Sequence, residues 1–241
     1  QKLGPRIGAQ AQKLKSLKRV LERTYPVVPR VTPMSCGGCP YNAFRDLPEK
    51  PGGAIGCSSI RAIEAYDTGV LYIPTMGAGG AIYSGWSQFN DHQHIYQYLG
   101  DGSYFHSGRG AIQSCVHGDV NITFLLLYNG AVALTGGQQP GGQRPVAEVV
   151  QELLGLGVVQ VGIVSENPDS HRHLAQETVD VYELVDHAKA LQRFKQISGT
   201  TVLILDKECA TEKGRRRRRQ GLTPDEYVMI DERICEGCGD C

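Results

Sequence analysis

The sequence predicts a doubly wound, mainly parallel α/β sheet, because strand-like runs alternate with amphipathic helices along most of the chain. The strand-like runs are almost entirely apolar, as expected for a parallel sheet covered on both faces. Thirty glycines in 241 residues provide tight turns and allow the backbone to pass close to a ligand. The strands are expected at residues 70–73, 94–99, 122–128, 158–164 and 201–205.

Helices are expected between these strands. One, at residues 107–116, follows the second strand, and another, at residues 185–197, precedes the last. A third helix is expected after the strand at 122–128, in a segment whose apolar residues repeat at helical spacing. These are Val146, Val149, Val150, Leu153 and Leu154. Ahead of the sheet, residues 10–25 have the pattern of a basic amphipathic helix.

Composition excludes several classes of function. Twenty-five basic residues balance twenty-five acidic ones, so net charge indicates neither a nucleic-acid nor a membrane partner. No apolar run approaches the roughly 18 residues of a spanning helix, and residues 1–21 lack the apolar core of a signal peptide. We therefore expect a cytoplasmic protein. The chain lacks an initiator Met and ends inside a cysteine repeat, so we expect it to belong to a longer polypeptide.

The end of the second predicted strand carries a motif suited to a diphosphate. A glycine-rich turn follows this strand directly and leads into a helix. Bare backbone amides and the dipole at the amino end of a helix both favour a phosphate group. The turn consists of Gly100, Asp101, Gly102 and Ser103. Asp101 would hold a cation that bridges phosphate oxygens, since Mg²⁺ prefers one or two carboxylates together with phosphate and water.

The next strand supports this interpretation. It ends at Asn129 and Gly130, and the carboxyl ends of parallel strands meet at one edge of the sheet, where ligands bind. The amide oxygen of Asn129 would then lie beside Asp101 and complete a magnesium site. The alternative is that both segments are ordinary turns at the ends of strands.

Eight cysteines give a second signal. They are Cys36, Cys39, Cys57, Cys115, Cys209, Cys235, Cys238 and Cys241. CxxC units in a chain that is not secreted indicate metal or cluster binding in preference to disulfides. Four thiolates suit either an iron–sulfur cluster or zinc, and spacing alone leaves both open. Cys115 falls inside a predicted helix and is expected to be a buried, apolar-like residue.

Together these motifs resemble those of the 2-oxoacid:ferredoxin oxidoreductases, especially the indolepyruvate ferredoxin oxidoreductases in their long fused form. The likeness lies in GDGSYFHSG, YNGAVALTGGQ, SCGGCPYN, the arginine run and CEGCGDC. It covers nearly the whole chain from Pro33 to Cys241. Relatives usually carry an acidic residue where Gly79 stands, and this difference leaves the substrate open.

The resemblance implies where thiamine diphosphate and its magnesium ion bind. The turn of residues 100–103 would hold the diphosphate, and Asp101 and Asn129 would ligate Mg²⁺ with the backbone carbonyl of Ala131. His106 would contact the diphosphate or the substrate, because relatives have a histidine at this place. Trp86 and Phe89 would either wall the substrate pocket or pack in the core.

The resemblance also implies which cysteines bind iron–sulfur clusters. Cys36, Cys39, Cys57 and Cys209 would hold one [4Fe–4S] cluster, with a zinc site as the alternative. The C-x2-C-x2-C unit opens a second [4Fe–4S] motif whose fourth ligand is missing from the chain. This unit is formed by Cys235, Cys238 and Cys241.

Three parts of the chain are expected. Residues 1–33 would form a helix and linker, residues 34–219 the thiamine-diphosphate-binding domain with its [4Fe–4S] loop, and residues 220–241 the truncated start of a ferredoxin-like domain. The five arginines of residues 215–219 would form a solvated linker, or one docked on an acidic neighbouring domain, in preference to a nucleic-acid patch.

The function implied by the resemblance is thiamine-dependent oxidative decarboxylation of a 2-oxoacid, indolepyruvate or another aryl or branched one. Coenzyme A would take the acyl group, and the electrons would pass through [4Fe–4S] clusters to ferredoxin. In this family a second domain, in the same polypeptide or a partner subunit, supplies the glutamate that activates thiamine. We find no such domain, so we expect the chain alone to be inactive and the complete enzyme to be a homodimer. A zinc-stabilised binding module and a non-oxidative thiamine decarboxylase are the alternatives.

Overall fold

A computed structural model describes residues 35–44, 47, 49–60, 70–91 and 93–222, with the single positions 12, 229, 231 and 234. The chain divides into two compact units, Gln1–Thr32 and Pro33–Cys241, and the description below concerns the second. Most of the helix predicted at 10–25 and most of the predicted domain at 220–241 lie outside the described residues.

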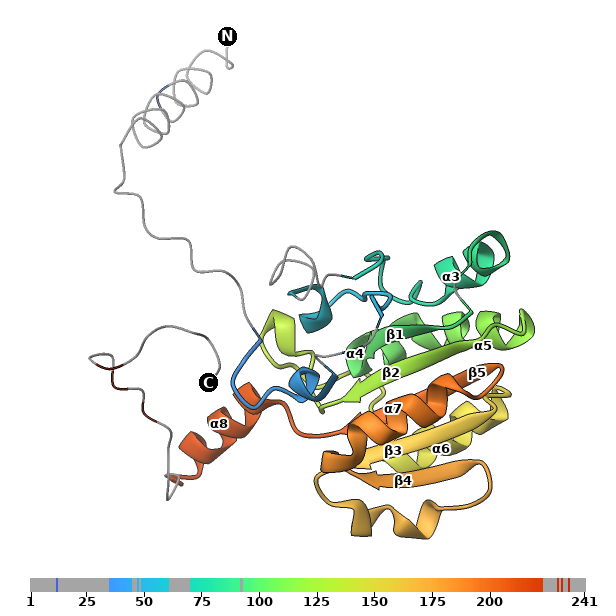
Figure 1. Ribbon diagram of the computed structural model, residues 1–241. Helices are drawn as coiled ribbons and strands as arrows, with labels where there is room; N and C mark the ends of the chain where they lie inside the picture. The colour runs from blue at the N-terminus through green and yellow to red at the C-terminus, as the bar shows by residue number, and fades with distance from the viewer. Residues whose placement is uncertain are drawn as a thin grey trace. The chain divides into compact units, whose positions relative to one another are not determined.

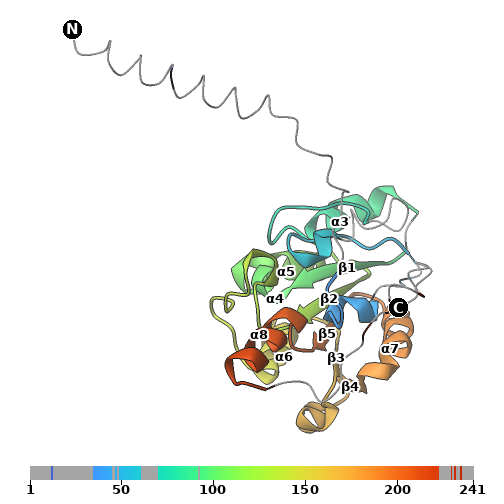
Figure 2. The same ribbon diagram turned by 90° about the vertical axis from the view of Figure 1, so that its left-hand side faces the viewer.

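A five-stranded sheet forms the centre of the domain, with the strand order β1-β2-β5-β3-β4. Every neighbouring pair is parallel, so all carboxyl ends lie at one edge. The strands are β1 (Ile95–Gly100), β2 (Ile122–Tyr128), β3 (Gln160–Ser165), β4 (Val179–Glu183) and β5 (Thr200–Asp206). Figures 1 and 2 show helices on both faces of this sheet. The predicted doubly wound α/β class is therefore confirmed.

The helices cover the two faces through separate apolar cores. The helices are α3 (Ala81–Trp86), α4 (Asp101–Ser103), α5 (Arg109–His117), α6 (Val146–Gly155), α7 (His187–Lys195) and α8 (Ala210–Arg219). Apolar residues of α3, α5 and α6 pack on one face, and those of α7 and the short 3-10 helix Pro40–Phe44 pack on the other. Because successive strand residues point to opposite faces, the apolar run of residues 124–128 in β2 supplies both cores.

One strand prediction was wrong, and one strand was not predicted. Residues 70–73 are not a sheet strand: the amide of Leu71 donates to Pro51, and Tyr72 accepts from Gly53, so this segment pairs with a loop. That loop pairs with β1 at an isolated bridge between Gly52 and Gln97, and the Gln97 side chain also donates to the Gly53 carbonyl at 2.6 Å. The fifth strand is instead β4, whose alternating sequence VDVYE suits an edge strand that is only partly buried.

Two helices also differ from prediction. The helix predicted at 107–116 begins earlier, because α4 starts at Asp101 and continues through the π-helical segment Tyr104–Gly108 into α5. The arginine run is not an irregular linker but the last turns of α8. The guanidinium of Arg216 donates two hydrogen bonds to the carboxylate of Glu208. Among the described residues, no helix is long and apolar enough to cross a membrane.

A buried histidine gives the fold a measurable pH dependence. His94 is 6% exposed, and its Nε2 hydrogen-bonds Thr123 Oγ1 at 2.8 Å. Burial lowers its pKa from 6.5 to about 4. The unfolded chain therefore binds more protons between these pH values, so stability falls as pH drops from 6.5 towards 4, by up to about 1.4 kcal/mol per pH unit. Denaturant unfolding at pH 7 and pH 5 should show a smaller difference for His94→Gln than for the wild type. Equal differences would contradict this prediction.

Candidate functional site

The candidate site lies where β1 and β2 end side by side. Gly100, the last residue of β1, is in register with Leu127 of β2, so the residues that follow the two strands are neighbours. The Asp101 carboxylate accepts the amide of Gly102 at 2.7 Å with one oxygen. Its other oxygen accepts the amides of Asn129 at 3.2 Å and Gly130 at 2.8 Å. The structure thus places the residues that follow β1 beside those that follow β2, as expected from the sequence.

The environment of Asp101 suits a bound cation. Asp101 is 2% exposed. Burial raises the pKa of its carboxyl to about 6, although hydrogen bonds from the surrounding backbone amides lower this pKa. Burial penalises the negative charge, and a nearby cation would offset that penalty. The carboxylate of Asp101 and the side-chain amide of Asn129 are both oxygen donors, as Mg²⁺ requires.

The turn after β2 holds Asn129 in place. Its side-chain oxygen accepts the amide of Ala131 at 3.1 Å, and Gly130 between them has a φ of +73°. A side chain at position 130 would strain this left-handed conformation, so glycine fits the turn. Asp101, Asn129 and Ala131 therefore lie together, as the predicted magnesium site requires.

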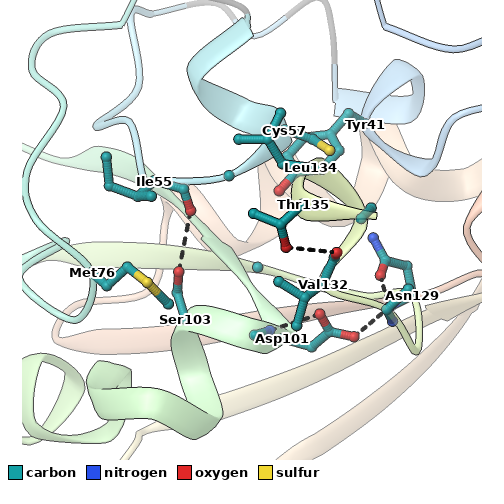
Figure 3. Close-up of a pocket in the computed structure, with 15 residues that line it drawn as sticks. Tyr41, Ile55, Cys57, Met76, Asp101, Ser103, Asn129, Val132, Leu134 and Thr135 are labelled. Atoms are coloured by element: carbon teal, nitrogen blue, oxygen red, sulfur yellow. Dashed lines mark hydrogen bonds between the residues drawn. The ribbon is translucent and has the colours of Figure 1, made fainter. Parts of the chain in front are cut away.

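These residues line a pocket, shown in Figure 3. Gly100, Asp101, Gly102 and Ser103 line it from β1 and α4, and Asn129 and Ala131 line it from the turn after β2. Apolar side chains complete the wall. They belong to Ile55, Met76, Val132, Ala133 and Leu134. The hydroxyl of Ser103 donates to the Ile55 carbonyl at 3.2 Å, which ties the helix start to the loop across the pocket.

Three other predicted contacts do not reach this pocket. His106 is exposed, and its Nδ1 hydrogen-bonds the hydroxyl of Ser107 at 2.7 Å. Phe89 is 84% exposed, and Trp86 packs against the core that contains Tyr83. None of the three is among the lining residues of the pocket.

One predicted cluster cysteine lines the same pocket. Cys57 begins the 3-10 helix Cys57–Ile60 and lies with Tyr41 on the side of the pocket opposite Asp101 in Figure 3. Cys209 lies at the amino end of α8, and its amide donates to the carbonyl of Asn129 at 3.1 Å. This bond links the distant cysteine directly to the turn that follows β2.

The other three predicted cluster cysteines lie near enough to Cys57 for their charges to act on its pKa. Burial, and then the charges of Cys36 and Cys209, raise the pKa of Cys39. Burial, followed by Cys39, Cys209 and Cys36, raises the pKa of Cys57 to about 11. Positive charge from bound iron would favour the thiolate forms. Cys115 has no part in this group and is fully buried in α5, as predicted.

The described side chains do not distinguish a zinc site from a cluster. Within the described part of the chain, no group of three or more His, Cys, Asp or Glu side chains is arranged to hold a metal ion. The remaining predicted ligands, Cys235, Cys238 and Cys241, lie outside the described residues.

Sequence reasoning missed Tyr41. This residue is 4% exposed, directly follows the CxxC unit and Pro40, and lines the pocket between the cysteines and the turn of Asp101. Its position two residues after Cys39 in the sequence was the available signal. Met76 was also missed as a lining residue, because in this segment the sequence analysis considered only Gly79, where the chain differs from its relatives.

The domain is found in known proteins. Residues 54–203 match the family described as thiamine pyrophosphate enzyme, C-terminal TPP binding domain. The chain is 24% identical to indolepyruvate oxidoreductase subunit IorA of Thermococcus kodakarensis over 91% of its own length and 36% of that protein. It is also 24% identical to IorA of Methanothermobacter marburgensis, over 90% of its length and 34% of that protein. The chain thus spans about a third of the length of these curated relatives.

A solved structure has the same fold. It is the 2-oxoglutarate:ferredoxin oxidoreductase of Magnetococcus marinus with 2-oxoglutarate, coenzyme A and succinyl-CoA bound. The similarity has a TM-score of 0.53 and 18% sequence identity, and it covers 85% of this chain and 75% of the other.

The chain belongs to the thiamine pyrophosphate enzymes and contains their C-terminal TPP-binding domain. The predicted kinship with the 2-oxoacid:ferredoxin oxidoreductases is confirmed at the level of the family, and so is the prediction that the chain is part of an enzyme.

Proposed function

We propose that the chain is the thiamine-diphosphate- and iron–sulfur-binding part of an enzyme that oxidatively decarboxylates a 2-oxoacid. Coenzyme A takes the acyl group and ferredoxin takes the electrons. Thiamine diphosphate supplies the carbanion chemistry that decarboxylation needs, and a [4Fe–4S] cluster removes electrons singly. One observation supports this proposal above all: Asp101 and Cys57, which come from the two predicted cofactor sites, line the same pocket.

Residues of this chain have distinct roles in the proposal. Asp101 and Asn129 would hold Mg²⁺ with the carbonyl of Ala131, and the turn of residues 100–103 would bind the diphosphate. Cys36, Cys39, Cys57 and Cys209 hold the cluster. The donor chemistry of both sets supports this assignment, since burial raises the pKa of the Asp101 carboxyl and of the Cys39 and Cys57 thiols, and a nearby cation would favour their charged forms.

The pocket also favours a substrate class. Ile55, Met76, Val132 and Leu134 provide an apolar wall beside Asp101. Such a wall suits an aryl or branched aliphatic side chain better than a second carboxylate, because a buried charge without a partner is costly. Indolepyruvate is therefore the first substrate to test, followed by other aryl and branched-chain 2-oxoacids. The domain or partner subunit that bears the activating glutamate completes the site.

Cofactor analysis tests this proposal. The enzyme, complete with its partner domains and purified without oxygen, is expected to contain thiamine diphosphate, iron and acid-labile sulfide. It should reduce ferredoxin when given coenzyme A and indolepyruvate or a related 2-oxoacid. Zinc without sulfide would contradict the cluster assignment. Thiamine with decarboxylation but without ferredoxin reduction would instead indicate a non-oxidative decarboxylase.

A further inference from the structure

We propose that the arginine-rich helix α8 is a docking surface for the acidic segment that follows it in the chain, residues 223–241. This segment carries the C-x2-C-x2-C unit, so docking would bring that unit beside the loop of Cys36 and Cys39. The docking itself does not depend on which cofactors the chain binds. Only its consequence for electron transfer rests on the proposed function.

The charges of the two segments are complementary. α8 contains six basic residues and one acidic residue, which gives it a net charge of +5. Residues 221–241 contain six acidic residues and one basic residue, which gives a net charge of −5. The acidic residues are Asp225, Glu226, Asp231, Glu232, Glu236 and Asp240. Each segment therefore carries the charge that the other lacks, and contact between them would relieve the repulsion within each.

Two of the five arginines are held by groups of their own domain. Arg215 donates to the carboxylate of Glu212 and to the carbonyl of Gly136. Arg216 donates two hydrogen bonds to the carboxylate of Glu208. These contacts fix the inner side of α8 to the turn and the loop beside it.

Arg217 and Arg218 point away from these carboxylates. Both are exposed, and neither forms an ion pair with a carboxylate of the described residues. The guanidinium of Arg218 donates to the carbonyl of Gly214 in its own helix at 3.4 Å. In a run of five arginines, like charges three and four residues apart are neighbours and repel each other. An acidic segment that reached Arg217 and Arg218 would supply counter-charges to both.

The face of α8 that carries these two arginines begins at the cysteine loop. Residues spaced by four, seven and eight positions share one face of a helix. This outer face consists of Ala210, Gly214, Arg217 and Arg218. A Cβ built on Gly38, which lies between Cys36 and Cys39, would be 3.9 Å from the Cβ of Ala210. The next residue, Thr211, has its Oγ1 3.5 Å from the Sγ of Cys36 (Figure 1). A segment lying along the outer face would therefore reach the CxxC loop.

The chain bends where α8 ends. The amide of Leu222 donates to the carbonyl of Arg217 at 2.9 Å, and the amide of Gly221 donates to that of Arg218 at 3.2 Å. Gly221 has a φ of +66°. This pair of bonds around a left-handed glycine is a Schellman motif, which ends a helix. The acidic segment thus begins at a bend whose amides contact the carbonyls of the two outer arginines.

The segment is long enough to return along the helix. The ten residues of α8 span about 15 Å. The thirteen residues from Leu222 to Cys235 could span roughly 43 Å if extended, so even a compact path reaches the cysteine loop. In the proposed function electrons leave the first cluster singly and end on ferredoxin. A second cluster held at this place would shorten the path between them.

Carbodiimide cross-linking of the complete enzyme tests the docking, because this reagent joins an amine to a carboxylate only where the two groups are in contact. Lys213 lies on α8 four residues before Arg217 and provides the amine. In the wild type we expect amide bonds between Lys213 and carboxylates of residues 231–240, identified by mass spectrometry. Lys189, an exposed lysine of α7, is the internal control and should not couple to these residues.

Charge reversal tests the role of the arginines. Arg217→Glu combined with Arg218→Glu replaces attraction by repulsion and should lower the yield of these cross-links roughly 10-fold or more. Adding Asp231→Arg and Glu232→Arg restores opposite charges and should recover most of the yield. Lys189→Glu reverses a charge elsewhere on the surface and should leave the yield unchanged. A Tm close to that of the wild type would show that each variant is folded.

Several results would overturn the inference. The wild type could lack the cross-links, or charge reversal could leave their yield unchanged. The cross-links could join two copies of the chain, which a doubled mass on denaturing gels would reveal. The enzyme could instead co-purify with nucleic acid that is lost on charge reversal, and α8 would then be a nucleic-acid site. The proposed function stands apart from these outcomes, because the contents of thiamine diphosphate, iron and sulfide decide it.

Discussion

Replacing Asp101 by alanine is expected to abolish binding of thiamine diphosphate and Mg²⁺ while the sheet remains folded. The variant removes the only carboxylate among the lining residues of the pocket in the described chain. Loss of a partner that merely orients a metal ligand weakens metal binding roughly 10- to 100-fold, so loss of a ligand itself should weaken it by at least about 100-fold. Calorimetric titration of the complete enzyme with thiamine diphosphate and Mg²⁺ measures this loss.

The controls separate the lost charge from local rearrangement. Asp101 also accepts three backbone amides, so alanine leaves these donors without their acceptor. Asp101→Asn keeps the shape and a hydrogen-bonding group but not the charge, and it should also fail to bind. Asp206→Ala at the end of β5 removes another strand-end carboxylate, one bonded to His171 and away from the pocket, and it should bind normally. Unchanged cofactor affinity in folded Asp101→Ala would refute the assignment.

The central part of this site could be predicted because it depends on local sequence and on a general property of parallel sheets. Apolar runs located β1 and β2, and the carboxyl ends of adjacent parallel strands necessarily meet. The proximity of Asp101 and Asn129 therefore required no knowledge of side-chain packing. Their proximity in the structure agrees with this expectation.

Elements with weaker periodicity were harder to locate. β4 carries charged residues and lies at the sheet edge, so it lacks the apolar run that marked the other strands. Residues 70–73 have such a run but pair with a loop, and an apolar segment of four residues cannot reveal its partner. The arginines of α8 showed no apolar face, and ion pairs such as Arg216 with Glu208 stabilise the helix instead.

The residues of the pocket wall could not be predicted, because they come from segments that are distant in the sequence. Tyr41, Met76 and Val132 come from three separate segments of the chain, and only the folded chain shows that they line one space with Asp101. The prediction for His106 relied on a motif position, but the π-helical turn leaves that side chain exposed. The position of Cys209 was predicted from resemblance, and its hydrogen bond to Asn129 supplies a physical link that spacing could not.

Replacing Cys57 by serine is expected to stop ferredoxin reduction while leaving 2-oxoacid binding intact. Serine preserves the size of the side chain but is a poor ligand for iron compared with a thiolate. Of the four predicted cluster cysteines, Cys57 is the one that lines the cofactor pocket within the described chain, so its loss should interrupt the path out of that pocket. Anaerobic assays with the complete enzyme would measure 2-oxoacid binding and ferredoxin reduction separately.

Cys115→Ser provides the matched control for this experiment. Cys115 is equally a free cysteine, but it is fully buried in α5 and contributes to the apolar core rather than to the cysteine group. Its replacement should cost stability, because a hydroxyl enters an apolar site, and should leave ferredoxin reduction in the folded enzyme unchanged. A structural cluster could occupy any part of the domain, whereas an electron outlet must adjoin the cofactor. If Cys57→Ser reduced ferredoxin at the wild-type rate, the cluster would have to be assigned a structural role.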